Sequence, residues 1–291
     1  MIFYGPKKKK QMKPLIKTIE GSRKDGKNVL VIAGVHGDEL TPIYTVGSMV
    51  KSKSGLLNEP LKFVKSITII NCLNISGLRS GSRETSSNAT NDLNRMLSNE
   101  DETDCLEILK EHIEKNDVVI DIHSSPTCAE FALVDIDEYT RSIMGWCEES
   151  NIKCAFRHSG ANTIKRYCLE QDKLAVTLEI NKMNTVDRES ANRCMIMVQN
   201  LIKSCPDFEV EKGEPLIEEP VREKKTYQEG IIDFWCKNGD SFLPGTVLCE
   251  IFDFEMNKIG EVKAEIAGWV VCEPSSSYVK RGDTLFLIQP I

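Results

Sequence analysis

Short apolar runs alternate with amphipathic segments over the first 205 residues, and this alternation constrains the fold more than any other feature of the sequence. The runs with the character of buried strands are 28–35, 66–73, 117–122, 131–134 and 173–180. The segments with helical spacing of apolar residues are 40–50, 102–115, 138–150 and 190–205. Strands that alternate with helices form a mostly parallel sheet with helices on both faces. The sequence therefore predicts an α/β fold with a mixed, mostly parallel sheet flanked by helices.

The pattern changes near Pro206, where a charged stretch with two prolines follows the last predicted helix. Beyond it, short strand-like runs are separated by glycines and no helical spacing is evident. Residues 239–251 and 275–288 resemble each other, since each has a turn, a glycine and then an alternating apolar run. We expect a catalytic domain at 1–207 and a small all-β, barrel-like domain at 208–291. The length of the second segment is within the usual size range of a domain.

Composition and charge exclude several classes of protein. The chain has 291 residues, of which 41% are hydrophobic and 28% charged, as in globular proteins. A formal net charge of -7 leaves no basic surplus for phosphates, so we expect no nucleic-acid partner; the one basic run, Lys7–Lys10, is interpreted as a solvated tail. No export signal or membrane-length apolar segment is present, which predicts a cytoplasmic protein without a membrane partner. The sequence leaves the oligomeric state open, a homo-oligomer included.

His36 and Glu39 follow the apolar run at 28–35, and His123 follows the run at 117–122. Functional groups collect at the carboxyl ends of parallel strands, so these three side chains are expected to converge. Two histidines and one glutamate are a usual set of protein ligands for a catalytic zinc ion. Taken singly, each histidine is better explained as a strand-end residue without a metal, and only the combination predicts a metal site.

A loop rich in Ser, Thr and Asn carries a second group of candidates. Asn94 and Arg95 combine an amide donor with a planar guanidinium, which suits a carboxylate ligand. Arg83 precedes them, and an arginine near a hydrolytic zinc can stabilise the oxyanion that develops on an attacked carbonyl. The alternative interpretation is a surface loop in which Asp92 caps a short helix.

Glu179 lies within the apolar run at 173–180. A carboxylate in such a strand is costly to bury unless it is paired or lies at the functional end of the strand. It is a candidate general base; the alternative is a glutamate at the edge of the sheet.

In this order, His36-x-x-Glu39, Arg83, Asp92-Leu93-Asn94-Arg95, Asp121-Ile122-His123 and Glu179 resemble the zinc carboxypeptidase-like superfamily. The β-module and the chain length are similar to the succinylglutamate desuccinylase/aspartoacylase branch. The resemblance implies that His36, Glu39 and His123 bind one zinc ion and that Glu179 is the general base and then acid. It implies further that Arg83 polarises the carbonyl, that Asn94 and Arg95 bind a substrate carboxylate, and that Asp92 orients His36.

Two departures from the family pattern stand out, and one further residue resembles it. The interval from Arg83 to Asp92 is long, so Arg79 competes with Arg83 for the oxyanion role. The family has a substrate-binding arginine shortly before the catalytic glutamate, whereas here only Lys165 and Arg166 are nearby, further upstream. Tyr278 resembles a tyrosine that the β-module contributes to the active site, and it fits a β-turn tyrosine as well.

The sequence therefore predicts a zinc-dependent hydrolase that cleaves the amide bond of a small N-acyl amino acid, a carbon–nitrogen bond other than a peptide bond. Its expected partner is a small carboxylate substrate. One alternative is a metallocarboxypeptidase that acts on peptide C-termini. A second is a carboxylate-binding protein without catalytic activity, although such a protein would have no need of a general base at position 179.

Overall fold

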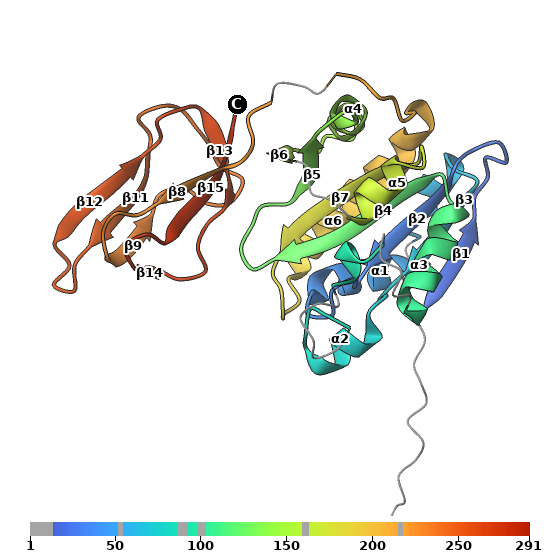
Figure 1. Cartoon of the computed structure of the whole chain (residues 1–291), viewed down its shortest axis with the longest axis horizontal. Helices are drawn as coiled ribbons and strands as arrows, with labels where there is room; N and C mark the ends of the chain where they lie inside the picture. Colours follow the sequence, from blue (N-terminus) through green and yellow to red (C-terminus); the bar gives the residue numbers. More distant parts are fainter. Residues whose placement is uncertain (1–13, 52–54, 86–91, 98–102, 159–162, 215–217) are drawn as a thin grey trace, which may run out of the picture.

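A computed structural model describes residues 14–51, 55–85, 92–97, 103–158, 163–214 and 218–291 (Figure 1). Its larger part is a seven-stranded sheet in the order β1-β3-β2-β4-β7-β5-β6. The strands are β1 (Ile16–Glu20), β2 (Asn28–Ala33), β3 (Ser66–Ile70), β4 (Val118–Ser125), β5 (Phe131–Ile136), β6 (Cys154–His158) and β7 (Leu174–Asn181). Strands β3, β2, β4 and β7 run parallel, whereas β1 and the β5–β6 pair run antiparallel to their neighbours in the sheet. The predicted fold class is confirmed.

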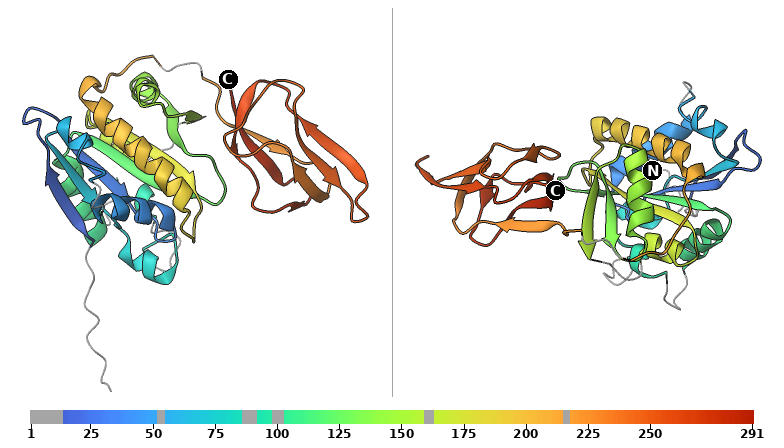
Figure 2. Two further views of the ribbon diagram at one scale, coloured as in Figure 1. Left: turned by 180° about the vertical axis from the view of Figure 1, so that it is seen from behind. Right: turned by 90° about the horizontal axis from the view of Figure 1, so that it is seen from above.

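Helices cover both faces of this sheet (Figures 1 and 2). On one face α1 (Leu40–Lys51) packs against α6 (Arg188–Ser204), and α4 (Thr140–Glu149) packs on β5 beside α6. The other face carries α3 (Asp104–Glu114) and α5 (Ile164–Leu169), the latter against β4 and β7. Short 3-10 helices lie at Pro60–Lys62 (η1), Leu93–Arg95 (η2) and Cys205–Asp207 (η3).

The sheet register brings the predicted site residues to one edge. The central strands are fully buried; Val29 to Ala33 of β2 are at most 1% exposed, which explains their uninterrupted apolar sequence. Ala33 pairs with Ile122, and His123 pairs with Glu179 in the parallel β4–β7 ladder. The end of β2, His123 and Glu179 therefore lie side by side at the carboxyl edge of three adjacent strands.

The C-terminal module contains two four-stranded antiparallel sheets around one apolar core (Figure 1). One sheet has the order β10-β13-β15-β8 and the other β12-β11-β9-β14. Their strands are β8 (Arg222–Lys225), β9 (Gly230–Phe234), β10 (Ser241–Phe242), β11 (Val247–Phe252), β12 (Lys258–Lys263), β13 (Gly268–Cys272), β14 (Tyr278–Val279) and β15 (Thr284–Pro290). The expected all-β module is thus present, and the domain boundary at 207/208 stays a prediction.

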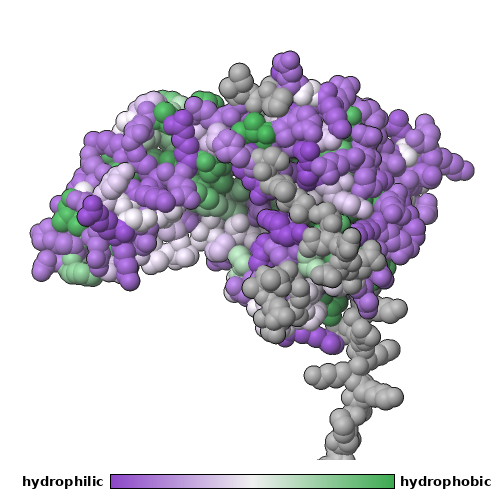
Figure 3. Space-filling view, in the orientation of Figure 1, coloured by the Kyte–Doolittle hydropathy of each residue, from purple (hydrophilic) through white to green (hydrophobic). Residues whose placement is uncertain are grey.

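A small apolar cluster joins the module to the larger part. Trp269 of β13 packs edge-on against Phe131 of β5, with 6.0 Å between the ring centroids. The backbone N–H of Ala129 donates to Val271, so the chain after β4 runs against β13. Elsewhere the face seen in Figure 3 is mainly hydrophilic over both parts. No helix in the described ranges is long and apolar enough to cross a membrane.

Some local predictions were wrong. A helix, α2 (Ile75–Ser80), forms inside the segment expected to be a loop, because Asn74 caps its first turn and Gly81 ends it with a left-handed φ of 65°. Strands β1 and β6 and helix α5 were not predicted, since their five or six residues give little periodicity. The run Lys7–Lys10 and part of the loop before Asp92 lie outside the described residues.

Candidate active site

The turn after β2 brings His36 and Glu39 together. Gly34 adopts a φ of +64°, which turns the chain directly after the buried strand. Gly37 packs against the backbone of α2, where an added Cβ would lie 2.0 Å from the carbonyl carbon of Gly77. Neither His36 nor Glu39 lies in a helix. They converge in this glycine-rich turn, and α1 begins only at Leu40.

His36, Glu39 and His123 form a buried cluster whose candidate ligand atoms all lie within 4.8 Å of one another. The Nδ1 atom of His36 is 2.6 Å from one Glu39 oxygen, and the Nδ1 of His123 is 3.2 Å from the other. The two Nδ1 atoms are 3.0 Å apart. Two imidazole nitrogens and a carboxylate thus point at one place, which is the arrangement that a cation requires.

The outer nitrogen of each histidine is held by an aspartate. The Nε2 of His36 lies 3.0 Å from Asp92, and the Nε2 of His123 lies 2.7 Å from Asp121. Histidines that ligate a metal usually donate their other ring N–H to such a carboxylate, which fixes the tautomer and the ring orientation. In the neutral form, a histidine held in this way directs the lone pair of its Nδ1 inward.

The electrostatics also suit a cation. Burial disfavours the charged form of Glu39, but the charge and hydrogen bond of His123, together with His36, lower the pKa of Glu39 to about 2. Burial likewise opposes protonation of His123, but Asp121 and Glu39 raise its pKa. Buried negative charge here thus attracts protons strongly, and it would attract a divalent ion in their place. Two neutral histidines and a carboxylate form a donor set that fits zinc and leaves a fourth position open.

Glu179 lies beside this cluster on β7. Its carboxylate accepts a hydrogen bond of 3.1 Å from the hydroxyl of Ser125 and lines the same cavity as the three candidate ligands. Burial raises the pKa of Glu179, although the charge of His123 partly opposes this. A carboxyl group with a raised pKa at a cluster of metal-ligand type is suited to accept and return a proton.

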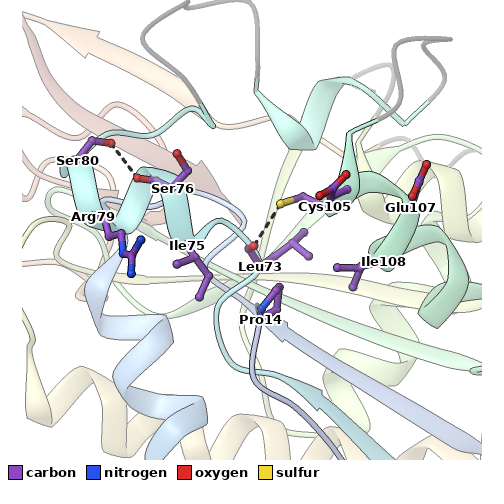
Figure 4. Close-up of a pocket in the computed structure, with 10 residues that line it drawn as sticks. Pro14, Leu73, Ile75, Ser76, Arg79, Ser80, Cys105, Glu107 and Ile108 are labelled. Carbon is purple, nitrogen blue, oxygen red and sulfur yellow. Dashed lines mark hydrogen bonds between the residues drawn. The ribbon is translucent and has the colours of Figure 1, made fainter. Parts of the chain in front are cut away.

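The structure separates the two competing arginines. Arg83 lines the cavity with its guanidinium 3.1 Å from Asp92 and 3.5 Å from Glu39. Arg79 projects from the far side of α2 into a different hollow, together with Ile75 (Figure 4). Of the two, only Arg83 is in a position to contact a group bound at the cluster.

Asn94 and Arg95 lie at the other wall of the cavity, on η2. The Asn94 amide oxygen accepts from the backbone N–H of Ile164 at 2.8 Å, and its nitrogen lies 3.3 Å from His123. Arg95 lines the same cavity, and one of its Nη atoms donates to the carbonyl of Asn94. The cavity measures about 250 Å³ and is lined by His36, Glu39, Arg83, Asn94, Arg95, His123, Ser124, Ser125, Pro126, Leu133, Arg157, Thr163, Thr177, Glu179 and Met183.

Residues 25–205 match the family model described as the succinylglutamate desuccinylase/aspartoacylase catalytic domain. The chain belongs to this family. Members of the family are generally hydrolytic deacylases, and in this chain the buried His36–Glu39–His123 cluster could hold a metal ion.

Solved structures of the family share the fold across the whole chain. The product-bound ectoine utilization protein EutE (DoeB) of Ruegeria pomeroyi is 18% identical, with 95% of this chain and 88% of that chain covered and a TM-score of 0.67. A succinylglutamate desuccinylase from Silicibacter sp. is 19% identical (94% and 87% covered, TM-score 0.64). An aspartoacylase family protein from Mesorhizobium loti is 17% identical (96% of each chain, TM-score 0.65). No curated protein matches this chain.

Lys165 and Arg166, the only basic residues found near the position of the family's substrate-binding arginine, do not line the cavity. Arg166 makes ion pairs with Asp137, Glu138 and Glu170. Lys165 is fully buried, and its ammonium group lies 2.9 Å from Asp135.

Tyr278 lies on β14 at a distance from the described lining residues. It is 39% exposed, its hydroxyl donates to Glu229, and its ring stacks on Phe254. Its role in substrate binding stays a prediction.

Arg157 was missed in the sequence. It lines the cavity from the end of β6, a short strand whose five residues are too few for a clear pattern. The rule that located His36 and His123 does not apply to Arg157, because β6 runs antiparallel to β7 and its carboxyl end faces the opposite edge of the sheet.

Proposed function

We propose that this member of the family is a zinc-dependent hydrolase that cleaves the amide bond of a small N-acyl amino acid. The observation that carries this proposal is the convergence of the buried His36–Glu39–His123 cluster and Glu179 in one cavity. A zinc ion bound by that cluster supplies a Lewis acid for the scissile carbonyl and lowers the pKa of water.

Glu179 acts as the general base and then as the general acid. Its carboxylate takes a proton from the attacking water and passes it to the leaving amine nitrogen as the carbon–nitrogen bond breaks. The Ser125 hydroxyl donates to one carboxylate oxygen, so the other oxygen is free to receive the proton. The products are the free acid of the acyl group and the free amino acid.

Arg83, Asn94 and Arg95 position the substrate. The Arg83 guanidinium lies close enough to the cluster to stabilise negative charge on the carbonyl oxygen. Asn94 and Arg95 bind the carboxylate of the amino acid, which aligns the amide with the cluster and the base.

The size of the cavity favours small substrates over peptides. About 250 Å³ is slightly below the usual range of pockets for drug-sized ligands. An N-acyl amino acid fits such a volume better than an extended peptide does.

A hydrolysis screen with the zinc-loaded protein tests the proposal. Substrates are N-acetyl, N-butyryl and N-succinyl amino acids beside a blocked dipeptide, with release of free amine as the readout. We expect hydrolysis of at least one N-acyl amino acid, little action on the dipeptide, and loss of activity in His36→Ala. The matched control is His112→Ala, because His112 lies on α3 with Nδ1 bonded to the carbonyl of Ile108.

Three results would contradict the proposal. Full activity of His36→Ala would show that the reaction does not depend on the proposed metal site. A preference for the dipeptide would favour a metallocarboxypeptidase. Tight binding of zinc and of an N-acyl amino acid without turnover would favour a carboxylate-binding protein.

A further inference from the structure

Two cysteines face each other where the β-module meets the large part of the molecule. Cys128 belongs to the connection between β4 and β5, and Cys272 is the last residue of β13. Both belong to the apolar cluster that joins the two parts. Cys128 is 2% exposed, whereas Cys272 is partly exposed to solvent. The pair therefore combines a buried thiol with one that a small molecule in solution can reach.

The backbone sets the two cysteines opposite each other. On one side of the pair, the N–H of Ala129 donates to the carbonyl of Val271 at 2.9 Å. On the other side, the hydroxyl of Thr127 donates to the carbonyl of Glu273. The connection thus runs antiparallel to the end of β13. Opposite residues of antiparallel strands have Cα atoms about 4.5–5.5 Å apart, and a disulfide usually spans about 4.4–6.8 Å.

The two side chains also meet. A hydrogen bond with the thiol of Cys272, together with burial, raises the pKa of Cys128. The Sγ atom of Cys128 lies 3.2 Å from the carbonyl oxygen of Ile180, which holds this side chain between β7 and β13. The two sulfur atoms are therefore placed for bond formation without a large movement of the backbone.

The difference in exposure sets the order in which the thiols react. The thiolate is the attacking species in thiol–disulfide exchange, and the raised pKa keeps Cys128 protonated at neutral pH. The partly exposed Cys272 therefore reacts first with an oxidant from solution. Cys128 reacts second, because its target is then the sulfur atom that it already contacts and the step is intramolecular.

We propose that Cys128 and Cys272 form a reversible disulfide that joins the β-module covalently to the connection between β4 and β5. The oxidant is a low-molecular-weight disulfide such as oxidised glutathione. Cys272 attacks one sulfur of this disulfide and releases its first thiol; Cys128 then attacks the Sγ of Cys272 and releases the second. Two protein thiols and one small disulfide become one protein disulfide and two small thiols, which carry away the two protons. An excess of a reducing thiol reverses both steps.

The disulfide would strengthen the contact between the module and the segment next to the base. Ser125, which donates to Glu179, lies three positions before Cys128. The bond closes a loop of about half the chain, and cross-links that close long loops restrict the unfolded state most. The oxidised protein should therefore melt about 5 °C or more above the reduced protein. Neither cysteine lines the cavity, so the bond forms whether or not the chain is a hydrolase.

Oxidation of the purified full-length protein tests the proposal. The protein is incubated with oxidised glutathione, the remaining thiols are alkylated, and its peptides are mapped by mass spectrometry without reduction. We expect the loss of two of the eleven thiols, one peptide pair that joins Cys128 to Cys272, and reversal by dithiothreitol. The rise in melting temperature should be absent in Cys272→Ser, a conservative change at a partly exposed position.

Cys147 and Cys154 are the matched control pair. A hydrogen bond with the thiol of Cys154, together with burial, raises the pKa of Cys147, but both residues lie within the large part, on α4 and β6. A Cys147→Ser, Cys154→Ser double variant should still form the peptide pair of Cys128 with Cys272 and should show the same rise in melting temperature on oxidation.

Three results would overturn the proposal. Eleven intact thiols, or a glutathione adduct that stays on Cys272, would show that Cys128 does not complete the exchange. A disulfide between other cysteines, with both thiols of this pair free, would assign the reactive pair elsewhere. Formation of the expected disulfide without a change in melting temperature would show that it does not hold the two parts together.

Discussion

The two parts of the molecule contribute differently to the candidate active site. Every described residue that lines the candidate active site belongs to the segment from His36 to Met183, on the strands of the large sheet and the connections between them. The β-module, from Arg222 onward, contributes none of them. Its contact with the large sheet is instead an apolar cluster around Trp269 and Phe131.

The β-module can nevertheless influence the site, because it contacts the segment that follows Ser125. Ser125, which donates to Glu179, begins the segment that runs from β4 to the module. Two residues later Thr127 donates to the carbonyl of Glu273, and Ala129 pairs with Val271. The module therefore braces the chain next to the base without contacting the cavity. The following predictions test that division.

The largest effect is expected from Glu179→Gln. The amide cannot accept the proton of water, so kcat should fall by about 10²- to 10⁴-fold while bound zinc is retained. Glu189→Gln, an exposed position on α6, is the control and should keep full activity. Normal turnover by Glu179→Gln would show that another residue is the general base, and it would contradict the role given to β7.

Asp135→Asn should destabilise the large part, because Lys165 would remain buried without its counter-ion. We expect a loss of about 3–5 kcal/mol in the free energy of unfolding at pH 7. The pKa of Asp135 is lowered in the folded state, so its contribution is full above the unfolded value of about 4 and is lost as the pH falls through the folded value. The gap between wild type and variant should therefore narrow below pH 4, as measured by urea denaturation.

The control for this pH effect lies in the β-module. Glu261 pairs with Lys258 and Lys263 on an exposed strand, where solvent screens the interaction. Glu261→Gln should change stability little at any pH. An equal loss in both variants would show that burial does not distinguish the two ion-pair groups.

Trp269→Ala should loosen the contact between the two parts. Trp269 is only 4% exposed, and loss of its ring should cost about 3 kcal/mol of unfolding free energy. If the module braces the segment that carries Ser125, kcat should fall several-fold while zinc content stays constant. If the protein is destabilised but kcat is unchanged, the module stabilises the fold and has no effect on the active site.

Tyr278→Phe is expected to have the smallest effect. The hydroxyl donates to Glu229 on the exposed side of the module, so its removal should change kcat/KM less than twofold and leave stability almost unchanged. A loss of tenfold or more in kcat/KM would show that the module reaches the substrate, which would reverse the comparison made above.

Much of the site could be predicted from the sequence because each central strand is an uninterrupted apolar run with a polar residue at its end. His36, His123 and Glu179 are conspicuous for that reason, and parallel strands must bring their ends together. The family resemblance also implied that Asp92 orients His36, and Asp92 does lie 3.0 Å from the outer nitrogen of that ring. The contact of Asp121 with His123 was not predicted, since it depends on side-chain orientation.

Other features depend on tertiary contacts that leave little local signal. Helix α2 forms in a Gly- and Ser-rich segment where Asn74 caps its first turn, and its backbone packs on Gly37, a contact that periodicity does not reveal. Arg157 lies on a five-residue strand, and its partner Asp135 is 22 positions away in the chain. Neither residue stands out until the sheet places β5 beside β6.

The central claim is that His36, Glu39 and His123 hold the metal ion on which hydrolysis depends. Elemental analysis of the purified protein, after equilibration with zinc and removal of excess, tests it most directly. We predict one zinc per chain in the wild type and in Glu179→Gln, and none in a His36→Ala, His123→Ala double variant that remains folded by circular dichroism. One zinc per chain in that folded double variant would contradict the account.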